Sequence, residues 1–297
     1  MRVITSLSDM GTLARNLRNQ GKVVTLVPTM GALHAGHLSL VEQARDGGDA
    51  LMVSIFVNPS QFGPGEDYER YPRNLEGDVE LLRPFNPEAV FAPAATDMYL
   101  PGSGTTVEPG PVALPLEGAA RPGHFRGVAT IVLKLFNIIR PHIAYFGQKD
   151  FQQAMVLRRM VLDLNVNTRI RVCPTVREPD GLAISSRNAY LSPEDRRRAP
   201  VVFRSLRRAR ELFQGGELSV SALLEGVRSV IAAEPAAKLE YAGVVNPLSM
   251  EPIEEAVPGS VALVAARIGP ARLIDNLILG PAEASEAELI ELALKEP

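Results

Sequence analysis

The chain has 297 residues, of which 46% are hydrophobic, and its formal net charge at pH 7 is −3. This composition is typical of a globular protein with one large or two ordinary domains, and the charge gives no general attraction to nucleic acid or to anionic membranes. The single Cys173 excludes an internal disulfide, and the N-terminal segment lacks the apolar region of a signal peptide. The longest apolar stretch (128–139) is too short to cross a bilayer. We therefore expect a cytoplasmic protein without nucleic-acid or membrane partners.

Up to about residue 175, short apolar runs alternate with stretches of helical spacing. The runs predict strands over residues 22–27, 51–57, 89–92, 143–146 and 168–173. Helices are predicted after a cap at Ser6, from about His37 to Gly47, over 75–82 and 128–139, and after Asp150, which also fits an N-cap. This alternation of strand and helix implies right-handed crossovers and a parallel sheet.

The pattern changes after about residue 187. Ser192-Pro193 begins a predicted helix over 193–213, a second helix follows over 219–232, and strands are predicted near 240–245, 261–266 and 272–279. The stretch 282–296 is predicted to be a surface helix or a frayed tail. Seven arginines between Arg196 and Arg210 suggest either a nucleic-acid face or a solvated helix face, and the flanking acids favour the second. These elements indicate a smaller α+β domain.

The most informative stretch is VPTMGALHAGHLSL, residues 27–40, which is typical of a buried strand end, a tight turn and a helix start. Gly31 and Gly36 allow a ligand to approach the backbone, and the helix start directs unpaired N–H groups toward the turn. His34 and His37 are three residues apart, so both can face the same side. The pattern predicts a site for an anion such as phosphate; the alternatives are a capped structural corner and a zinc pair completed by another histidine.

Polar residues follow other predicted strands as well. Asn58–Gln61 and Gly147–Gln153 each come directly after a strand, and Ser185–Arg187 follows the next strand after a longer loop. Ligands of open parallel sheets bind beyond the carboxyl ends of the strands, so we expect these patches and the histidine turn to meet on one rim. Their cations and helix starts suit a polyphosphate, and their glutamines suit a neutral or hydroxylated substrate. The motifs of a P-loop, of a dinucleotide-binding turn and of a nucleophile elbow are absent from the sequence.

Residues 93–125 contain many prolines and glycines and little periodicity. Segments of this length in compact domains are usually functional lids or disordered. The stretch EGAARPGHFRG (117–127) carries Arg121, His124 and Arg126, which either hold an anion or belong to a solvated loop. The sequence assigns Arg121 and His124 no particular role.

These motifs together resemble those of the pantoate–β-alanine ligases, or pantothenate synthetases, of the adenylate-forming nucleotidyltransferase superfamily. The resemblance rests on PTMGALHAGHLSLV, SIFVNPSQFGPGEDYERYPR, EGAARPGHFRGVATIV, YFGQKDFQQ, ISSRNAYLSP and RLIDN, with Gln148 standing where many relatives have Glu. It implies an α/β fold with a Rossmann-like parallel-sheet N-terminal domain (1–184) and a smaller α+β C-terminal lid domain (185–297). It also implies ATP as co-substrate, Mg²⁺, a homodimer, and condensation of pantoate with β-alanine through pantoyl adenylate, with release of pyrophosphate and AMP.

The resemblance further implies which residues form the site. The ATP-binding residues would be Met30, Gly31, Ala32, Leu33, His34, Ala35, Gly36 and His37, then Gly147, Gln148, Lys149 and Asp150, and finally Val176, Ile184, Ser185, Ser186 and Arg187. Among them His34, His37, Lys149 and Arg187 are the implied catalytic residues, with His37 as the family's proton donor. Gln61 and Gln153 would bind pantoate, with Gln61 also near β-alanine. We predict Asp78 as a carboxylate near the magnesium ion, directly or through water.

Two other functions share parts of this pattern. A related nucleotidyltransferase would transfer AMP to a phosphate and stop, but the two glutamines and the lack of a cationic pocket for a phosphorylated acceptor favour the ligase. A non-catalytic nucleotide sensor would bind a partner instead, and the intact His34, His37, Lys149 and Arg187 argue against it.

Overall fold

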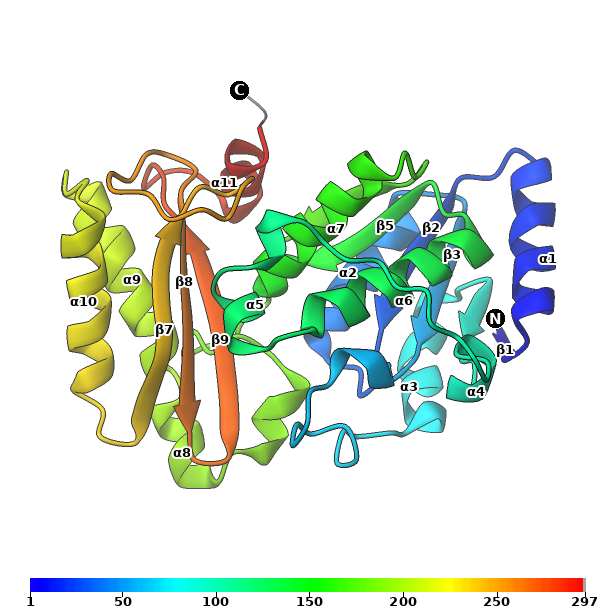
Figure 1. Cartoon of the computed structure of the whole chain (residues 1–297), viewed down its shortest axis with the longest axis horizontal. Coiled ribbons are helices and arrows are strands. Elements are labelled where there is room, and N and C mark those ends of the chain that lie inside the picture. Colours follow the sequence, from blue (N-terminus) through cyan, green and yellow to red (C-terminus); the bar gives the residue numbers. More distant parts are fainter. Residues whose placement is uncertain (296–297) are drawn as a thin grey trace. The chain divides into compact units, whose positions relative to one another are not determined.

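The computed structural model describes residues 1–295 of the chain, which form two compact units (Figure 1). The first unit comprises Met1–Ala113, Gly118–Phe146 and Val156–Val172. The second comprises Leu114–Glu117, Gly147–Met155 and the chain from Cys173 onward. Two short segments of the N-terminal half therefore pack with the C-terminal half.

A six-stranded sheet forms the centre of the first unit. Its strands are β1 (Arg2–Ile4), β2 (Val24–Thr29), β3 (Ala50–Ile55), β4 (Ala89–Phe91), β5 (Ile143–Gly147) and β6 (Arg169–Cys173). Their order is β1-β4-β3-β2-β5-β6, and β2 pairs in parallel with both β3 and β5. The predicted Rossmann-like parallel sheet is confirmed. Because the chain leaves β2 toward β3 and returns to β5 on its other side, the strand order reverses at β2, and such a reversal is where open α/β sheets bind ligands.

Helices separate these strands along the chain. They are α1 (Leu7–Asn19), α2 (Ala35–Asp46), α3 (Leu75–Leu82), α4 (Ala95–Met98), α5 (Glu117–Ala120), α6 (His124–Ile139) and α7 (Phe151–Asp163). The predicted cap of the first helix is present, because the Ser6 side chain accepts from the Asp9 N–H at 3.3 Å. Met10 of α1, Leu26 of β2 and Phe136 of α6 are among the largest fully buried side chains, so the core lies between this sheet and its helices.

Two predictions for this unit were incomplete. The three-residue strand β1 was not predicted, because so short a run shows no periodicity. Helix α6 begins at His124, four residues before the predicted start, after Gly123 in a left-handed conformation (φ +84°). The polar residues of its first turn, which the apolar pattern excluded, therefore belong to a helix rather than to a loop.

The second unit has its own antiparallel sheet, β7 (Ala237–Val245), β8 (Val261–Ile268) and β9 (Ala271–Ile278). Helices α9 (Val201–Gln214) and α10 (Val220–Ala232) pack on it (Figure 1), and Leu206, Leu223 and Val264 lie in their shared core. The single helix predicted over 193–213 was wrong. It is divided into α8 (Pro193–Arg198) and α9 at Pro200, which has no N–H for a helical hydrogen bond.

The last described helix is α11 (Glu286–Ala293), which begins with a capping box between Ser285 and Glu288. It lies within the predicted surface helix or frayed tail of 282–296, whose last residue is outside the described part of the chain. None of the helices in residues 1–295 combines the length and the apolar character needed to cross a membrane.

Candidate active site

The histidine turn lies directly beyond β2, at the reversal of the strand order. Gly31 has φ +81° and Ala32 has φ +49°, so the chain passes through two left-handed residues before α2 begins at Ala35. His34 is the N-cap residue of α2, and its ring stacks on that of His37 with centroids 4.0 Å apart. Both imidazoles are partly exposed beside the N-terminal end of the helix. This arrangement concentrates N–H groups, the positive end of a helix dipole and two titratable rings, which together suit an anion.

Asp78 of α3 accepts hydrogen bonds from the backbone of this turn. Its Oδ2 accepts from the Ala32 N–H at 3.0 Å and its Oδ1 from the Leu33 N–H at 2.8 Å. A Cβ on Gly31 would lie 2.8 Å from Oδ2, so this close approach requires glycine. The Asp78 carboxylate is 4% exposed, and burial raises its pKa although the two backbone hydrogen bonds act in the opposite direction. Asp78 therefore stabilises a backbone conformation that non-glycine residues rarely adopt.

Gln61 lies beside the turn, at the end of a short 3-10 helix, η1 (Pro59–Gln61). Its Oε1 accepts from Asn58 Nδ2 at 3.0 Å, and its Nε2 lies 3.2 Å from Met30 Sδ. The Asn58 amide is oriented in turn, because its Oδ1 accepts from the hydroxyls of Ser60 and Tyr99 at 2.9 and 2.7 Å. The amide nitrogen has two N–H groups, of which one faces Met30 Sδ, so Gln61 keeps a second N–H donor that suits a carboxylate or hydroxyl oxygen.

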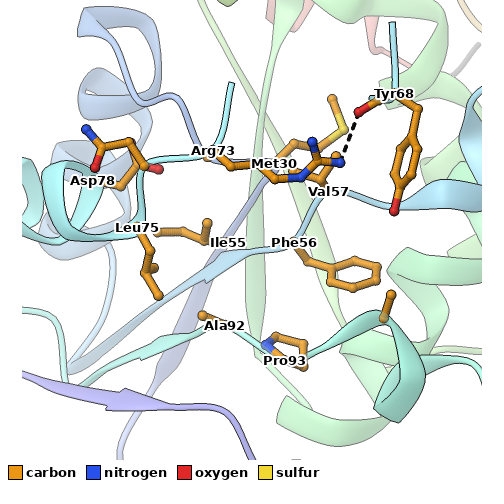
Figure 2. Close-up of a pocket in the computed structure, with 13 residues that line it drawn as sticks. Met30, Ile55, Phe56, Val57, Tyr68, Arg73, Leu75, Asp78, Ala92 and Pro93 are labelled. Atoms are coloured by element: carbon orange, nitrogen blue, oxygen red, sulfur yellow. Dashed lines mark hydrogen bonds between the residues drawn. The ribbon is translucent and has the colours of Figure 1, made fainter. Parts of the chain in front are cut away.

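Met30 and Gly31 of the turn also line a pocket of about 270 Å³. Figure 2 shows Met30, Ile55 and Asp78 on its wall, with Arg73 donating to the Tyr68 carbonyl at 2.9 Å. The remaining wall is mostly apolar and comes from the ends of β3 and β4. The turn is thus accessible from the carboxyl edge of the sheet.

The segment 147–155 belongs to the second unit, where Asn276 of β9 holds it. Asn276 Nδ2 donates to the carbonyl oxygens of Gln148 and Lys149 at 2.9 and 3.0 Å, and Gln148 Nε2 donates to Asn276 Oδ1 at 3.2 Å. Gln148 and Asn276 are each 1% exposed. Lys149 Nζ lies 3.4 Å from the carboxylate of Asp150, which is about half exposed. Buried bonds therefore fix the backbone while Lys149 and Asp150 keep access to solvent.

The third predicted ATP segment is also anchored in this unit. The Ile184 N–H donates to the Val176 carbonyl at 3.0 Å, so these two predicted contacts are side by side. Arg177 forms a paired bond with Asp275 of β9 at 2.6 and 2.9 Å, and Asp275 is 4% exposed. Ser185 caps the short 3-10 helix Ser186–Tyr190 by accepting from the Arg187 N–H at 3.3 Å. Arg187 is partly exposed at the start of that helix.

A third contact from β9 supports the start of α7. Arg272 forms a bidentate pair with Glu117 at 2.7 and 2.8 Å, and the Glu117 N–H donates to Gln152 Oε1 at 3.1 Å. Gln152 Nε2 donates onward to the Pro115 carbonyl at 2.8 Å. The neighbouring Gln153 is partly exposed on α7. The RLIDN stretch thus contacts the segment 147–150 and Arg177 directly, and it supports the start of α7 through Glu117.

The structure therefore groups the predicted site residues as follows. Met30–His37, Gln61 and Asp78 come together in the first unit, and Gly147–Asp150, Gln153, Val176 and Ile184–Arg187 belong to the second. Asn58 lies in the predicted patch Asn58–Gln61, and Glu66 and Asn276 lie inside motifs that carry the resemblance, but none of the three was assigned a role of its own. A side chain that orients another residue leaves no pattern of its own in the sequence.

A parallel sheet with a glycine-containing turn and a helix start at its strand reversal defines an α/β protein of the Rossmann-like class. The family model described as "Pantoate-beta-alanine ligase" matches residues 2–278. The pantothenate synthetase of Roseiflexus sp. (strain RS-1) is 54% identical over 94% of this chain and 99% of that protein. The one from Geobacter sulfurreducens is 51% identical over 94% of this chain and 99% of that protein.

Solved structures agree with these relatives. The pantothenate synthetase from Thermus thermophilus has a TM-score of 0.90 and 46% identity, covering 95% of this chain and 100% of that chain. The pantoate-beta-alanine ligase from Francisella tularensis, complexed with beta-gamma ATP and beta-alanine, has a TM-score of 0.78 and 36% identity over 96% of this chain and 99% of that chain. The chain belongs to the pantoate–β-alanine ligase family. It is a ligase that forms pantothenate from pantoate and β-alanine.

Proposed function

We propose that the chain joins pantoate to β-alanine in two steps that consume ATP. In the first, a pantoate carboxylate oxygen attacks the α-phosphorus, and the bond from that phosphorus to the bridging oxygen breaks to release pyrophosphate. In the second, the β-alanine amine attacks the acyl carbon of pantoyl adenylate, loses its proton and displaces AMP. The observation that carries this proposal is the stacked pair of histidines at the start of α2, next to a Gln61 carboxamide that keeps an N–H donor for an acid.

The proposed ATP contacts come from the three segments predicted earlier. Residues Met30–His37 would receive phosphate at the start of α2, with His34 and His37 as the cationic groups. Gly147–Asp150 would supply Lys149 to phosphate and the Asp150 carboxylate to ribose hydroxyls. Val176 and Ile184–Arg187 would supply a further segment, in which Ser185, Ser186 and Arg187 hold phosphates. The Francisella tularensis enzyme that resembles this chain was solved with a beta-gamma ATP ligand, which supports ATP as the co-substrate.

The proposed catalysis is by positioning and charge. A carboxylate is a poor electrophile, and transfer of AMP to it provides a good leaving group. Negative charge accumulates on the phosphates in the first step, so His37, His34, Lys149 and Arg187 would act by stabilising that charge in a preorganised site. Gln61 and Gln153 would hold pantoate with its carboxylate directed at the α-phosphorus, and Gln61 would lie near β-alanine.

Magnesium would arrive with ATP, and no proposed step depends on a metal ion held by the protein alone. Both Asp78 oxygens accept backbone N–H groups, so this carboxylate is a poor direct ligand. In residues 1–295 no group of three or more His, Cys, Asp or Glu side chains is placed to hold a metal. Mg²⁺ commonly binds through substrate phosphates and water with one or two carboxylates, and Asp78 acting through water is consistent with that pattern.

ATP–pyrophosphate isotope exchange without β-alanine tests the first step. We expect exchange that requires pantoate and that falls by roughly 100-fold or more in His37→Ala and Lys149→Ala, because each removes a charge that the transition state needs. Gln153→Ala should raise the KM for pantoate far more than the KM for ATP. Exchange that does not depend on pantoate would refute the ligase reaction, and equal changes in the two KM values would refute the role of Gln153.

We propose residues 1–184 as the domain that binds ATP and pantoate and residues 185–297 as a lid domain. A homodimer and a cytoplasmic location are proposed from the family resemblance and from the single buried Cys173. Sedimentation velocity at several concentrations tests the dimer, which predicts twice the mass of 32.1 kDa.

A further inference from the structure

Arg121 and His124, to which the sequence assigned no role, both contact the main chain of Gln61. Nδ1 of His124 lies 2.8 Å from the Gln61 carbonyl oxygen, and Arg121 donates to the same oxygen at 3.3 Å. Arg121 also forms a paired bond with Glu66 at 2.7 and 2.6 Å, and its second terminal nitrogen lies 3.1 Å from His124 Nε2. We call Glu66, Arg121 and His124 the Gln61 clamp.

The chemistry of these groups determines where the His124 proton lies. A carbonyl oxygen only accepts hydrogen bonds, so His124 Nδ1 carries the proton that it donates to Gln61. A guanidinium only donates hydrogen bonds, so His124 Nε2 is the unprotonated ring nitrogen, which accepts from Arg121. The hydrogen bonds therefore run in one direction, from Arg121 through His124 to Gln61, while Glu66 balances the guanidinium charge.

The clamp is built into the fold rather than lying on the surface. His124 is 8% exposed, and the side chains of Arg121 and Glu66 are 13% and 25% exposed. His124 is the first residue of α6, and α6 packs on the turn that carries Gln61 at Gly127, where a Cβ would lie 2.2 Å from the Ser60 carbonyl oxygen. Charge-assisted bonds with little contact to water are stronger than exposed ones.

We propose that the Gln61 clamp positions Gln61 for pantoate, an inference that rests on the proposed role of Gln61 in binding that acid. The clamp holds the main chain of Gln61, and Asn58 holds its Oε1. The Nε2 donor next to Met30 is the group left to meet a carboxylate or hydroxyl oxygen. Fixing both ends before the substrate binds places that donor without a loss of rotamer freedom on binding.

Steady-state kinetics of His124→Ala and His124→Asn test the clamp. The alanine variant should raise the KM for pantoate about tenfold, the effect of one well-made hydrogen bond, with the KM for ATP changed less than about twofold. Asparagine carries an N–H close to the position of Nδ1 and should restore the pantoate KM to within about threefold of wild type. Glu66→Ala should act in the same direction as His124→Ala, because Arg121 then loses its paired anchor.

His142→Ala is the matched control. Its Nδ1 accepts from the Val24 N–H at 2.9 Å, at the amino end of β2 and so at the opposite edge of the sheet from the turn. Loss of this histidine also breaks a hydrogen bond to the main chain, but the pantoate KM should stay at the wild-type value. A general loss of folding in the first unit would lower the maximal rate of both alanine variants, because fewer molecules are active, and would not raise the KM for pantoate alone.

A double-mutant cycle separates positioning from a structural effect. If His124 acts through Gln61, then His124→Ala added to Gln61→Ala should not change the pantoate KM further. Additive effects, equal changes in both KM values, or no rescue by asparagine would overturn the clamp. The ligase reaction itself is tested apart from this cycle, because the exchange assay measures pantoate dependence in the wild-type enzyme, where the clamp is intact.

Discussion

Replacing Gly127 by alanine tests how closely α6 packs on the turn that carries Gln61. An alanine in the middle of a helix usually stabilises a protein by about 0.5–1 kcal/mol relative to glycine. At Gly127, however, the new Cβ would lie 2.2 Å from the Ser60 carbonyl oxygen and 2.7 Å from the Gln61 Cα. A carbon–oxygen contact normally measures at least roughly 3.3 Å, so the backbone of the turn must move by about 1 Å.

The balance of these effects sets the expected magnitude. Overpacking in a well-packed core costs typically about 1–3 kcal/mol, and here no flexible side chain can relieve it because the clashing atoms are main chain. After subtraction of the helix gain, we expect Gly127→Ala to lower the free energy of unfolding by about 1–2 kcal/mol. The same displacement moves Gln61, so the pantoate KM should rise as well.

Gly11→Ala in α1 provides the control. A Cβ there would lie 3.6 Å from the Ile138 carbonyl oxygen, an ordinary contact, so this variant should be stabilised by about 0.5–1 kcal/mol. Urea unfolding followed by circular dichroism compares the two through their midpoints, provided that the slopes agree. If Gly127→Ala were as stable as Gly11→Ala, the packing argument would be refuted.

Three further predictions concern charged groups. Asp78→Ala removes both oxygens that accept the N–H groups of the histidine turn, so the KM for ATP should rise about tenfold or more. Asp78→Asn keeps one of these acceptors, so its KM for ATP should lie between those of the wild type and of Asp78→Ala. Identical KM values in all three proteins would contradict the role of Asp78 in holding the turn. Arg272→Met leaves the Glu117 carboxylate, 7% exposed, without its guanidinium, and urea unfolding should show a loss of about 3–5 kcal/mol that Glu117→Gln partly restores. Burial acts to raise the pKa of Glu66, but the hydrogen bonds and charge of Arg121 outweigh it and hold that pKa below its ordinary value. The pair therefore stabilises the fold above the unfolded-state pKa and loses this effect as the pH falls through the folded-state pKa. Thermal melts of wild type and Glu66→Gln should therefore stay apart at pH 7 and converge as the pH falls through the lowered pKa of Glu66.

The sequence predicts the parallel sheet and the smaller domain well, because buried strands and amphipathic helices have periods that are visible along the chain. The division at Pro200 was predictable in principle, since proline breaks the helical hydrogen-bond ladder, but the charged residues around it have strong helical propensity and conceal it. The histidine turn also follows from local pattern, because its glycines and its helix start are adjacent in the chain.

What the sequence could not provide are contacts between distant residues. Glu66 lies 55 residues from Arg121, and Asn276 lies 127 residues from Lys149, so no local spacing relates them. The Asp78 bonds to Ala32 and Leu33 are of the same kind, and they assign this carboxylate to the backbone of the turn. Such roles depend on packing in three dimensions, whereas a sequence motif shows only that a residue type is present.

Strand β9 never needs to meet a substrate in order to matter for the reaction. Asn276 donates to the carbonyls of Gln148 and Lys149, and Asp275 pairs with Arg177. A version of the chain that ends before Ala271 would therefore lose the hydrogen bonds that hold these two segments. The matched family region ends at residue 278, the last residue of this strand. Genetic screens for inactive forms of the protein should therefore return substitutions in β9 alongside those in the histidine turn.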